Sequence, residues 1–311
     1  MTTAPFPSYN PDPVSTTEPP PKSPFAEKRA GAPRISACII SFNEERNIDA
    51  CLESVAWCDE IVVVDSFSTD RTPEIARGRG ARVVQATWTG HVAQKNRAVE
   101  EARGEWLLAI DCDERVTPRL RREIESRLAS GGTADGYAIA RKLFYLGRWL
   151  EHGGWFPEWR VRLFRRGRSR WTGVDPHDTV EVDGRTERIE PEGEGTDAAV
   201  ILHHSFRDLS HQLKVLDRYS EIQAGELFRR GRRPRAGDLT LRPLWRFIWC
   251  YILRAGFLDG EPGFQMAVNH AYAAYMKYAK LWEINRGLAT LRDKSDLVPE
   301  EDPLARRGRS G

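Results

Sequence analysis

The sequence lacks the features that would by themselves indicate a membrane, secreted or nucleic-acid-binding protein. Its 47 lysines and arginines nearly balance its 45 aspartates and glutamates, so the net charge of +2 argues neither for nor against nucleic acid as a partner. No run of 18 uncharged residues occurs, and we therefore expect no membrane-spanning helix. The chain opens with neither a basic segment nor an apolar run, so we expect no signal peptide.

Cysteine is also scarce, and its five copies include no Cys-x-x-Cys pair. An odd number of thiols scattered through apolar runs is typical of a reduced, cytosolic protein. Cys112 lies between two aspartates, and we interpret it as a small space-filling side chain rather than a nucleophile.

From residue 34 onward, short apolar runs alternate with segments of helical spacing. We expect strands over residues 35–41, 60–65, 81–84 and 106–110, and helices over residues 43–56, 72–80, 91–103 and from the Thr117-Pro118 cap onward. We expect Thr72 to cap its helix, because proline and glutamate follow it. The alternation is typical of an α/β fold in which helices cover both faces of a mostly parallel sheet.

Polar residues follow three of these strands, at residues 41–44, 65–70 and 111–114. In doubly wound sheets, ligands bind where the carboxyl ends of the strands meet. The sequence therefore predicts a polar rim along one edge of the sheet.

The stretch at residues 105–116, EWLLAIDCDERV, is the most informative part of that rim. Its apolar run ends in Asp111, Asp113 and Glu114, and three carboxylates at a buried strand end repel one another and lose water. Mg²⁺ or Mn²⁺ removes that cost, because these cations take oxygen ligands from one or two carboxylates and from substrate phosphates. A solvated acidic turn that caps the next helix is the alternative.

Two neighbouring segments supply candidate nucleotide-binding groups. Asp65 ends a strand of valines, and its carboxylate could accept hydrogen bonds from a nucleobase or a ribose. Ser66 belongs to the turn that follows, whose other polar residues are also explained by turn formation alone. Lys95 offers a cation that could meet a diphosphate, and an isolated surface lysine is the alternative.

Residues 153–166 carry aromatic and arginine side chains. Trp155 could stack on a sugar ring, and Arg162 could hold a phosphate through two hydrogen bonds. A packed β-ribbon with solvated arginines is the alternative.

Taken in order, several of these segments resemble family 2 glycosyltransferases, and the lipopolysaccharide-core and related cell-envelope branch in particular. The resemblance covers roughly residues 34 to 285. It is carried by IISFNEERNI, DEIVVVDSFSTDRT, QKNRA and WLLAIDCDERV in the first half, and by GGWFPEWRVRLFRR, GVDPHDTVEV and GFLDG in the second.

The resemblance implies a GT-A fold and a divalent cation, Mg²⁺ or Mn²⁺. It implies that Asp113 binds the cation directly and that Asp111 binds the cation or the ribose. Asp65 matches the carboxylate that recognises the nucleoside. Asn43 and Glu44 match positions that line the nucleotide pocket.

The resemblance also bears on the catalytic base. Related sequences usually carry His-Glu after Gly-Val, whereas this chain reads Asp175-Pro176-His177-Asp178 after Val174. We expect Asp178 to be the base, with Asp175 as the second candidate. His177 is interpreted as a metal or phosphate ligand or as an ordinary hydrogen-bonded histidine. Inversion of the anomeric centre is what the family implies.

The carboxyl-terminal third is predicted to be helical. Leucines at 209, 213 and 216 have helical spacing, and a cluster of arginines follows at residues 229–235. Residues 244–258 are apolar and aromatic but too short and too charged to span a bilayer, so we expect them to lie at a membrane surface. A core helix packed against the catalytic domain is the alternative.

We therefore predict four regions: a disordered proline-rich tail at 1–33, a catalytic domain at 34–205, a helical extension at 206–285 and a polar tail at 286–311. The predicted function is metal-dependent, inverting transfer of a sugar, UDP-linked by preference, to a cell-envelope glycan or lipid-linked acceptor. We expect a peripheral location on the cytoplasmic face of the inner membrane and no nucleic acid partner. A nucleotidyltransferase of sugar phosphates is one alternative, although no glycine-rich phosphate loop occurs between Ile35 and Ile48. A non-catalytic nucleotide-binding module is the other.

Overall fold

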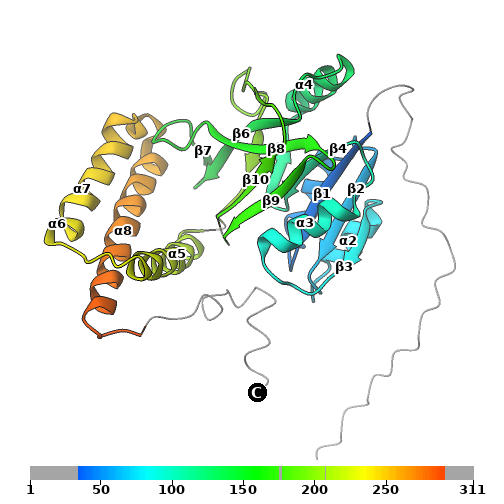
Figure 1. Cartoon of the computed structure of the whole chain (residues 1–311). Helices are drawn as coiled ribbons and strands as arrows, with labels where there is room; N and C mark the ends of the chain where they lie inside the picture. Colours follow the sequence, from blue (N-terminus) through cyan, green and yellow to red (C-terminus); the bar gives the residue numbers. More distant parts are fainter. Residues whose placement is uncertain (1–33, 175–176, 207, 291–311) are drawn as a thin grey trace, which may run out of the picture.

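The computed structural model describes residues 34–174, 177–206 and 208–290, and every structural statement below concerns those residues. The predicted tail at residues 1–33 lies outside them, as does most of the predicted tail at residues 286–311. Figure 1 shows a curled sheet flanked by helices and a further group of helices at one end of the molecule.

The first half of the sheet is parallel. Its strands lie in the order β3 (Arg82–Gln85), β2 (Glu60–Asp65), β1 (Ile35–Ser41) and β4 (Trp106–Asp111). The accompanying helices are α1 (Ile48–Ser54), α2 (Thr72–Gly78), α3 (His91–Glu101) and α4 (Pro118–Ala129). The predicted α/β fold is confirmed.

Beyond β4 the sheet is mixed, so the predicted parallel order holds for its first four strands. The strands that follow β4 across the sheet are β8 (Glu158–Arg165), β6 (Gly136–Tyr145), β12 (Ile201–His203) and β5 (Glu114–Val116). Strand β8 is antiparallel to β4, and β6 also pairs with β11 (Thr186–Ile189) and β7 (Arg148–Trp149). A separate antiparallel hairpin consists of β9 (Ser169–Val174) and β10 (His177–Val182).

The alternation of side chains along β1 divides the core between the two faces of the sheet. Ala37 and Ile39 pack with α1, α2 and α4 on one face, whereas Cys38 packs with α3 on the other. Helix α4 begins where the sequence predicts, because the Thr117 hydroxyl accepts a hydrogen bond from the backbone N–H of Leu120 at 3.2 Å. The two apolar layers fix the strands whose ends form the site.

The helical region lies at one end of the molecule (Figure 1) and follows β12 in the chain. Its elements are α5 (Leu209–Arg229), α6 (Ala236–Leu239), α7 (Leu241–Ile248), the π-helical turn η1 (Trp249–Leu253), the 3-10 turn η2 (Gly256–Asp259) and α8 (Gly260–Asn285). Among the described residues, no helix is both long enough and apolar enough to cross a membrane. The boundaries of the four predicted regions stay predictions.

Two details of this region differ from the sequence reading. Leu209 and Leu213 have helical spacing, yet they are exposed, and α5 instead buries Gln212 and Ala224. Gln212 is buried because its Oε1 accepts hydrogen bonds from the hydroxyl of Tyr145 at 2.5 Å and from the side-chain amide of Asn269 at 2.7 Å. The apolar segment at residues 244–258 is also not one helix, since it is divided among α7, η1 and η2.

Candidate functional site

Three strand ends meet at one edge of the sheet. Ser41 of β1 is in register with Asp65 of β2, and Ile40 of β1 is in register with Asp111 of β4. The structure therefore brings the predicted polar rim together, because parallel strands end at the same edge.

Asp65 is fully buried and organises the loop that follows β2. Its Oδ1 accepts hydrogen bonds from the hydroxyls of Ser41 at 2.9 Å and Ser68 at 2.5 Å. Its Oδ2 accepts from the backbone N–H of Ser68 at 2.9 Å and from Nε2 of Gln85 at 3.0 Å. Because four donors already engage this carboxylate, contact with a nucleobase requires one of them to be exchanged.

The loops after β1 and β2 are tied to each other. The backbone N–H of Asn43 donates to Oγ of Ser68 at 2.8 Å, and its Oδ1 accepts from the backbone N–H of Thr69 at 2.8 Å. The backbone N–H of Glu44 donates to the hydroxyl of Thr72 at 2.7 Å. Helix α2 begins at Thr72 with Arg71 in the cap position, so Thr72 is not the cap of its helix, contrary to the prediction. Asn43 and Glu44 position the backbone of the rim.

Next to Asp65, the loop also presents an aromatic side chain to solvent. Ser66 is buried and accepts a hydrogen bond from Nε2 of Gln94 at 2.7 Å, whereas Phe67 is 54% exposed. Phe67 has a φ of 59°, in the left-handed region that bulky residues rarely adopt. The sequence reading did not single out Phe67.

Asp111 lies within a chain of alternating charges. Its Oδ2 accepts from Nη2 of Arg162 at 2.7 Å, and its Oδ1 lies 3.1 Å from Nζ of Lys95. Nη2 of Arg162 also contacts Oε1 of Glu114 at 2.6 Å, and Nη1 of Arg141 contacts the same oxygen at 2.8 Å. Burial alone would raise the pKa of Asp111, but the charges of Arg162 and Lys95 hold that pKa well below its usual value.

Arg162 is predicted to hold a phosphate or the acceptor, and the structure gives its guanidinium other partners. The residue is 3% exposed, and its Nη2 is already shared between Asp111 and Glu114. Its Nε and the indole Nε1 of Trp171 are buried without a hydrogen-bond partner among the described residues, and both residues line a cavity of about 10 Å³ together with Asp111. Arg162 therefore orients the Asp111 carboxylate and compensates its negative charge.

Lys95 joins the rim to the β9–β10 hairpin. Its Nζ lies 2.7 Å from Oδ2 of Asp178 in β10 and 4.5 Å from the ring centroid of Trp171 in β9. Asn96 fixes the hairpin to α3, because its side chain donates to the carbonyl of Trp171 and accepts from the N–H of Trp171, each at 2.9 Å. Lys95, Asp111 and Asp178, three residues predicted for the site, thus meet although they lie far apart in the sequence.

Asp113 lies against a histidine that the sequence reading missed. Nε2 of His203 is 3.2 Å from Oδ2 of Asp113, and the backbone N–H of His204 donates to the Asp113 carbonyl at 2.9 Å. Burial would raise the pKa of Asp113, but the neighbouring His203 lowers it below the usual value. No cluster of three metal-ligating side chains occurs in the described part of the chain. A carboxylate beside an imidazole nevertheless fits a cation such as Mn²⁺, whose remaining ligands come from water and phosphate.

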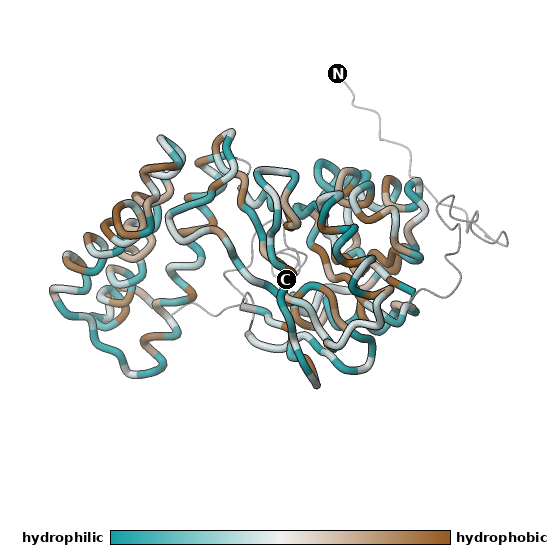
Figure 2. The backbone as a smooth tube through the Cα atoms, turned by 90° about the horizontal axis from the view of Figure 1, so that it is seen from above, coloured by the Kyte–Doolittle hydropathy of each residue, from teal (hydrophilic) through white to brown (hydrophobic). Residues whose placement is uncertain are grey.

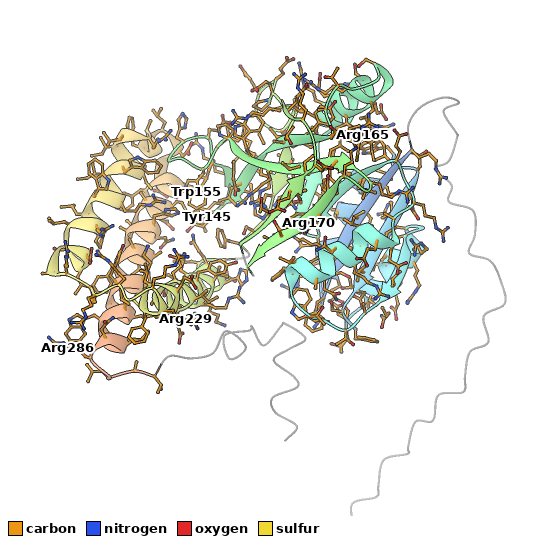
Figure 3. The ribbon with its side chains drawn as sticks, viewed as in Figure 1. Tyr145, Trp155, Arg165, Arg170, Arg229 and Arg286 are labelled. Carbon is orange, nitrogen blue, oxygen red and sulfur yellow. The ribbon has the colours of Figure 1, made fainter. Side chains whose placement is uncertain are left out.

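The remaining predicted site residues lie in another part of the structure or outside the residues that it describes. Asp175 is outside the described residues, and the side chain of His177 is likewise not described. Trp155 packs on the helical region, with its ring centroid 4.5 Å from that of His270 in α8. Figure 3 shows Trp155 beside Tyr145, on the side of the sheet that faces the C-terminal helices. Trp155 thus packs with the helical region and not with Lys95 and its partners Asp111 and Asp178.

Comparisons with known proteins identify relatives of this chain. Residues 36–180 match the family model described as glycosyl transferase family 2. The lipopolysaccharide core biosynthesis glycosyltransferase LpsC of Rhizobium meliloti (strain 1021) is 31% identical over 261 residues, which cover 80% of this chain and 92% of LpsC. The low-salt glycan biosynthesis hexosyltransferase Agl6 of Haloferax volcanii is 38% identical over 273 residues, which cover 80% of this chain and 60% of Agl6.

Solved structures also resemble the chain. Staphylococcus aureus TarS residues 1–349 are 17% identical with a TM-score of 0.41, over 83% of this chain and 93% of TarS. Glucosyl-3-phosphoglycerate synthase from Mycobacterium tuberculosis, in a complex with Mn²⁺, UDP and glucosyl-3-phosphoglycerate, is 27% identical with a TM-score of 0.30. That match covers 37% of this chain and 45% of the synthase.

Proposed function

Because the chain belongs to glycosyl transferase family 2 and is therefore a glycosyltransferase, we propose that it transfers a sugar from a nucleoside diphosphate to a hydroxyl group of a cell-envelope glycan or a lipid-linked acceptor. We propose UDP as the nucleotide of the donor. LpsC, a relative over most of the chain, is named for lipopolysaccharide core biosynthesis, which supports an envelope acceptor. The acceptor would be met at the cytoplasmic face of the membrane.

The observation that carries this proposal is the pairing of Asp113 with His203, next to Asp111. Asp113 follows β4 and His203 ends β12, so two separate strand ends place a carboxylate and an imidazole 3.2 Å apart at one edge. These two residues would hold Mg²⁺ or Mn²⁺. When bound, such a cation neutralises the charge that develops on a leaving diphosphate.

The residues of the chain itself supply the other parts of the reaction. Asp178 would accept the proton of the acceptor hydroxyl as that oxygen bonds to the anomeric carbon and the bond from that carbon to the diphosphate oxygen breaks. General base catalysis of this kind contributes about 10² to 10⁴-fold to the rate. A single in-line displacement inverts the anomeric centre. Lys95, whose Nζ contacts both carboxylates, would position Asp178 near Asp111.

The test combines nucleotide binding with product analysis. A thermal-shift panel of UDP, GDP and ADP, each with and without Mn²⁺, should show stabilisation by UDP only when the metal is present. The shift should be lost in Asp113→Asn and kept in Asp197→Asn, because the side chain of Asp197 is exposed to solvent. With UDP-sugars and an envelope extract, the protein should release UDP. Release of pyrophosphate would favour a nucleotidyltransferase, and nucleotide binding without turnover would favour a binding module.

A further inference from the structure

The helical hairpin formed by α7, η1, η2 and the first turns of α8 exposes many large apolar side chains. Along α7, Leu241, Leu244 and Trp245 follow helical spacing and are 57% to 68% exposed. At the tip of the hairpin, four more are 48% to 59% exposed: Ile252, Leu253, Phe257 and Leu258. We name these seven residues the hairpin surface. Isolated exposed apolar residues are ordinary, but a contiguous group of this size marks a binding surface.

The hairpin surface continues onto α8 through ring contacts. Phe264 of α8 lies 5.8 Å from Phe247 and 5.5 Å from Tyr251, centroid to centroid, and Tyr251 lies 6.2 Å from Phe257. Exposed residues then recur along α8 at helical spacing, namely Val268, Tyr272 and Tyr275. Figure 2 shows apolar segments on these helices at the end of the molecule away from the parallel strands.

Cations flank this apolar surface, and almost no exposed acid accompanies them. Of the five lysines and arginines between residues 240 and 282, Arg242 and Lys280 are paired with acidic residues of α6 and α5. The other three are Arg246, Arg254 and Lys277, and the acidic residues of the same stretch are Asp259 and Glu261. Asp259 is buried and accepts hydrogen bonds from the backbone N–H groups of Glu151 and His152. Burial, together with the charges of Arg242 and Arg246, lowers the pKa of Lys277, as expected where cations gather.

We propose that the hairpin surface docks on a membrane that contains anionic phospholipid. Its Trp and Leu side chains would enter the boundary between headgroups and acyl chains, and Arg254 and Lys277 would contact lipid phosphates. Aromatic and aliphatic side chains flanked by cations are the composition that suits this boundary. The proposal rests on the proposed function to the extent that a lipid-linked acceptor lies in such a membrane.

A second copy of the chain fits this surface less well. A symmetric pair brings the same patch of each copy together, so the cations around one hairpin would face those around the other. Anionic lipid instead neutralises them. Charge complementarity therefore favours a lipid surface.

The hairpin is also firmly attached to the sheet, so docking would fix the orientation of the site. The backbone N–H of Gly153 donates to the carbonyl of Arg254 at 2.8 Å. Oδ1 of Asp259 contacts Nδ1 of His152 at 2.9 Å, and Nη2 of Arg148 donates to the carbonyl of Leu258 at 3.3 Å. These contacts join the tip of the hairpin to β7 and the loop after it.

Co-sedimentation of the full chain with vesicles tests the proposal. The protein should pellet with vesicles of phosphatidylcholine and phosphatidylglycerol, and several-fold less with phosphatidylcholine alone. The double variant Trp245→Gln/Leu253→Gln should bind at least about tenfold more weakly, because each substitution removes an apolar side chain that the membrane would bury. Lys277→Gln should weaken binding to the anionic vesicles about fivefold. Leu213→Gln, which removes an exposed leucine from α5, should bind as the wild type does.

Two results would overturn the proposal: no binding to either kind of vesicle, or undiminished binding by the double variant. A concentration-dependent dimer that the double variant abolishes would show that a second copy covers this surface instead. The nucleotide-dependent thermal shift should be unchanged in all these variants. Vesicle binding by a protein that does not bind nucleotide would contradict the proposed function and leave the docking surface standing.

Discussion

Nζ of Lys95 lies 2.7 Å from Oδ2 of Asp178 and 3.1 Å from Oδ1 of Asp111, so one ammonium group joins the ends of two different sheets. The side chain of Lys95 is only 11% exposed, and water screens these contacts weakly. Lys95 therefore couples the predicted base to the predicted donor site.

Replacing the proposed base should lower turnover itself. Asp178→Asn keeps the size of the side chain but accepts no proton, so we expect kcat to fall by about 10² to 10⁴-fold. Binding of UDP with Mn²⁺, measured by calorimetry, should stay within a few-fold of the wild type. An Asp178→Asn enzyme with nearly full kcat would exclude Asp178 as the base.

The buried ion pairs of Arg162 predict a difference in stability between two arginines of β8. Arg162→Met removes the buried guanidinium that contacts both Asp111 and the fully buried Glu114. Lys95 and Arg141 remain beside these carboxylates, so we expect the free energy of unfolding to fall by about 1.5 to 3 kcal/mol, the range for a hydrogen bond to a charged group. Arg160→Met removes only the contact with Glu158, in which both side chains are more than one third exposed, and should cost less than about 1 kcal/mol. Urea unfolding of the two variants measures both values, and equal values would contradict the account.

The prediction from the sequence succeeded where the information was local. Continuous apolar runs identified β1, β2 and β4, because strands buried on both faces need such runs. The polar residues that follow these runs were expected at one edge of the sheet, because parallel strands end at the same edge. The cap at Thr117 followed from residues adjacent in the chain.

The sequence could not provide contacts between distant segments. His203 reaches Asp113 only because β12 lies antiparallel to β5, some 90 residues away along the chain, and no motif surrounds it. The pairing of Arg162 with Asp111 likewise depends on the antiparallel register of β8 on β4. Leu213 is exposed although its spacing is helical, because Gln212 beside it takes the buried position through its hydrogen bonds.

The backbone conformation at Phe67 predicts that glycine at this position gives a more stable protein than alanine does. A φ of 59° costs an L-residue about 1 to 2 kcal/mol, and glycine avoids that cost. We expect Phe67→Gly to unfold at a higher urea concentration than Phe67→Ala, which also loses the ring but keeps the strained Cβ. Equal midpoints for the two variants would show that no strain is relieved.

His270 predicts that stability falls on acidification. Burial and the charge of Arg246 lower its pKa from 6.5 to about 4. The unfolded chain takes up a proton near pH 6.5 and the folded chain does not, so stability is lost as pH falls from about 6.5 to 4. The loss should reach about 3 kcal/mol. His270→Gln should flatten this part of the curve, measured by thermal unfolding at a series of pH values, and an unchanged slope would contradict the assignment.

The pairing of Asp113 with His203 is the feature on which the proposed function depends, and binding of Mn²⁺ in the presence of UDP tests it most directly. Electron paramagnetic resonance of free Mn²⁺ measures this binding without turnover. We expect the wild type and Asp197→Asn to remove Mn²⁺ from solution when UDP is present. His203→Gln should bind Mn²⁺ at least about tenfold more weakly, and Asp113→Asn should not bind it. Undiminished Mn²⁺ binding by Asp113→Asn would show that Asp113 does not hold the cation.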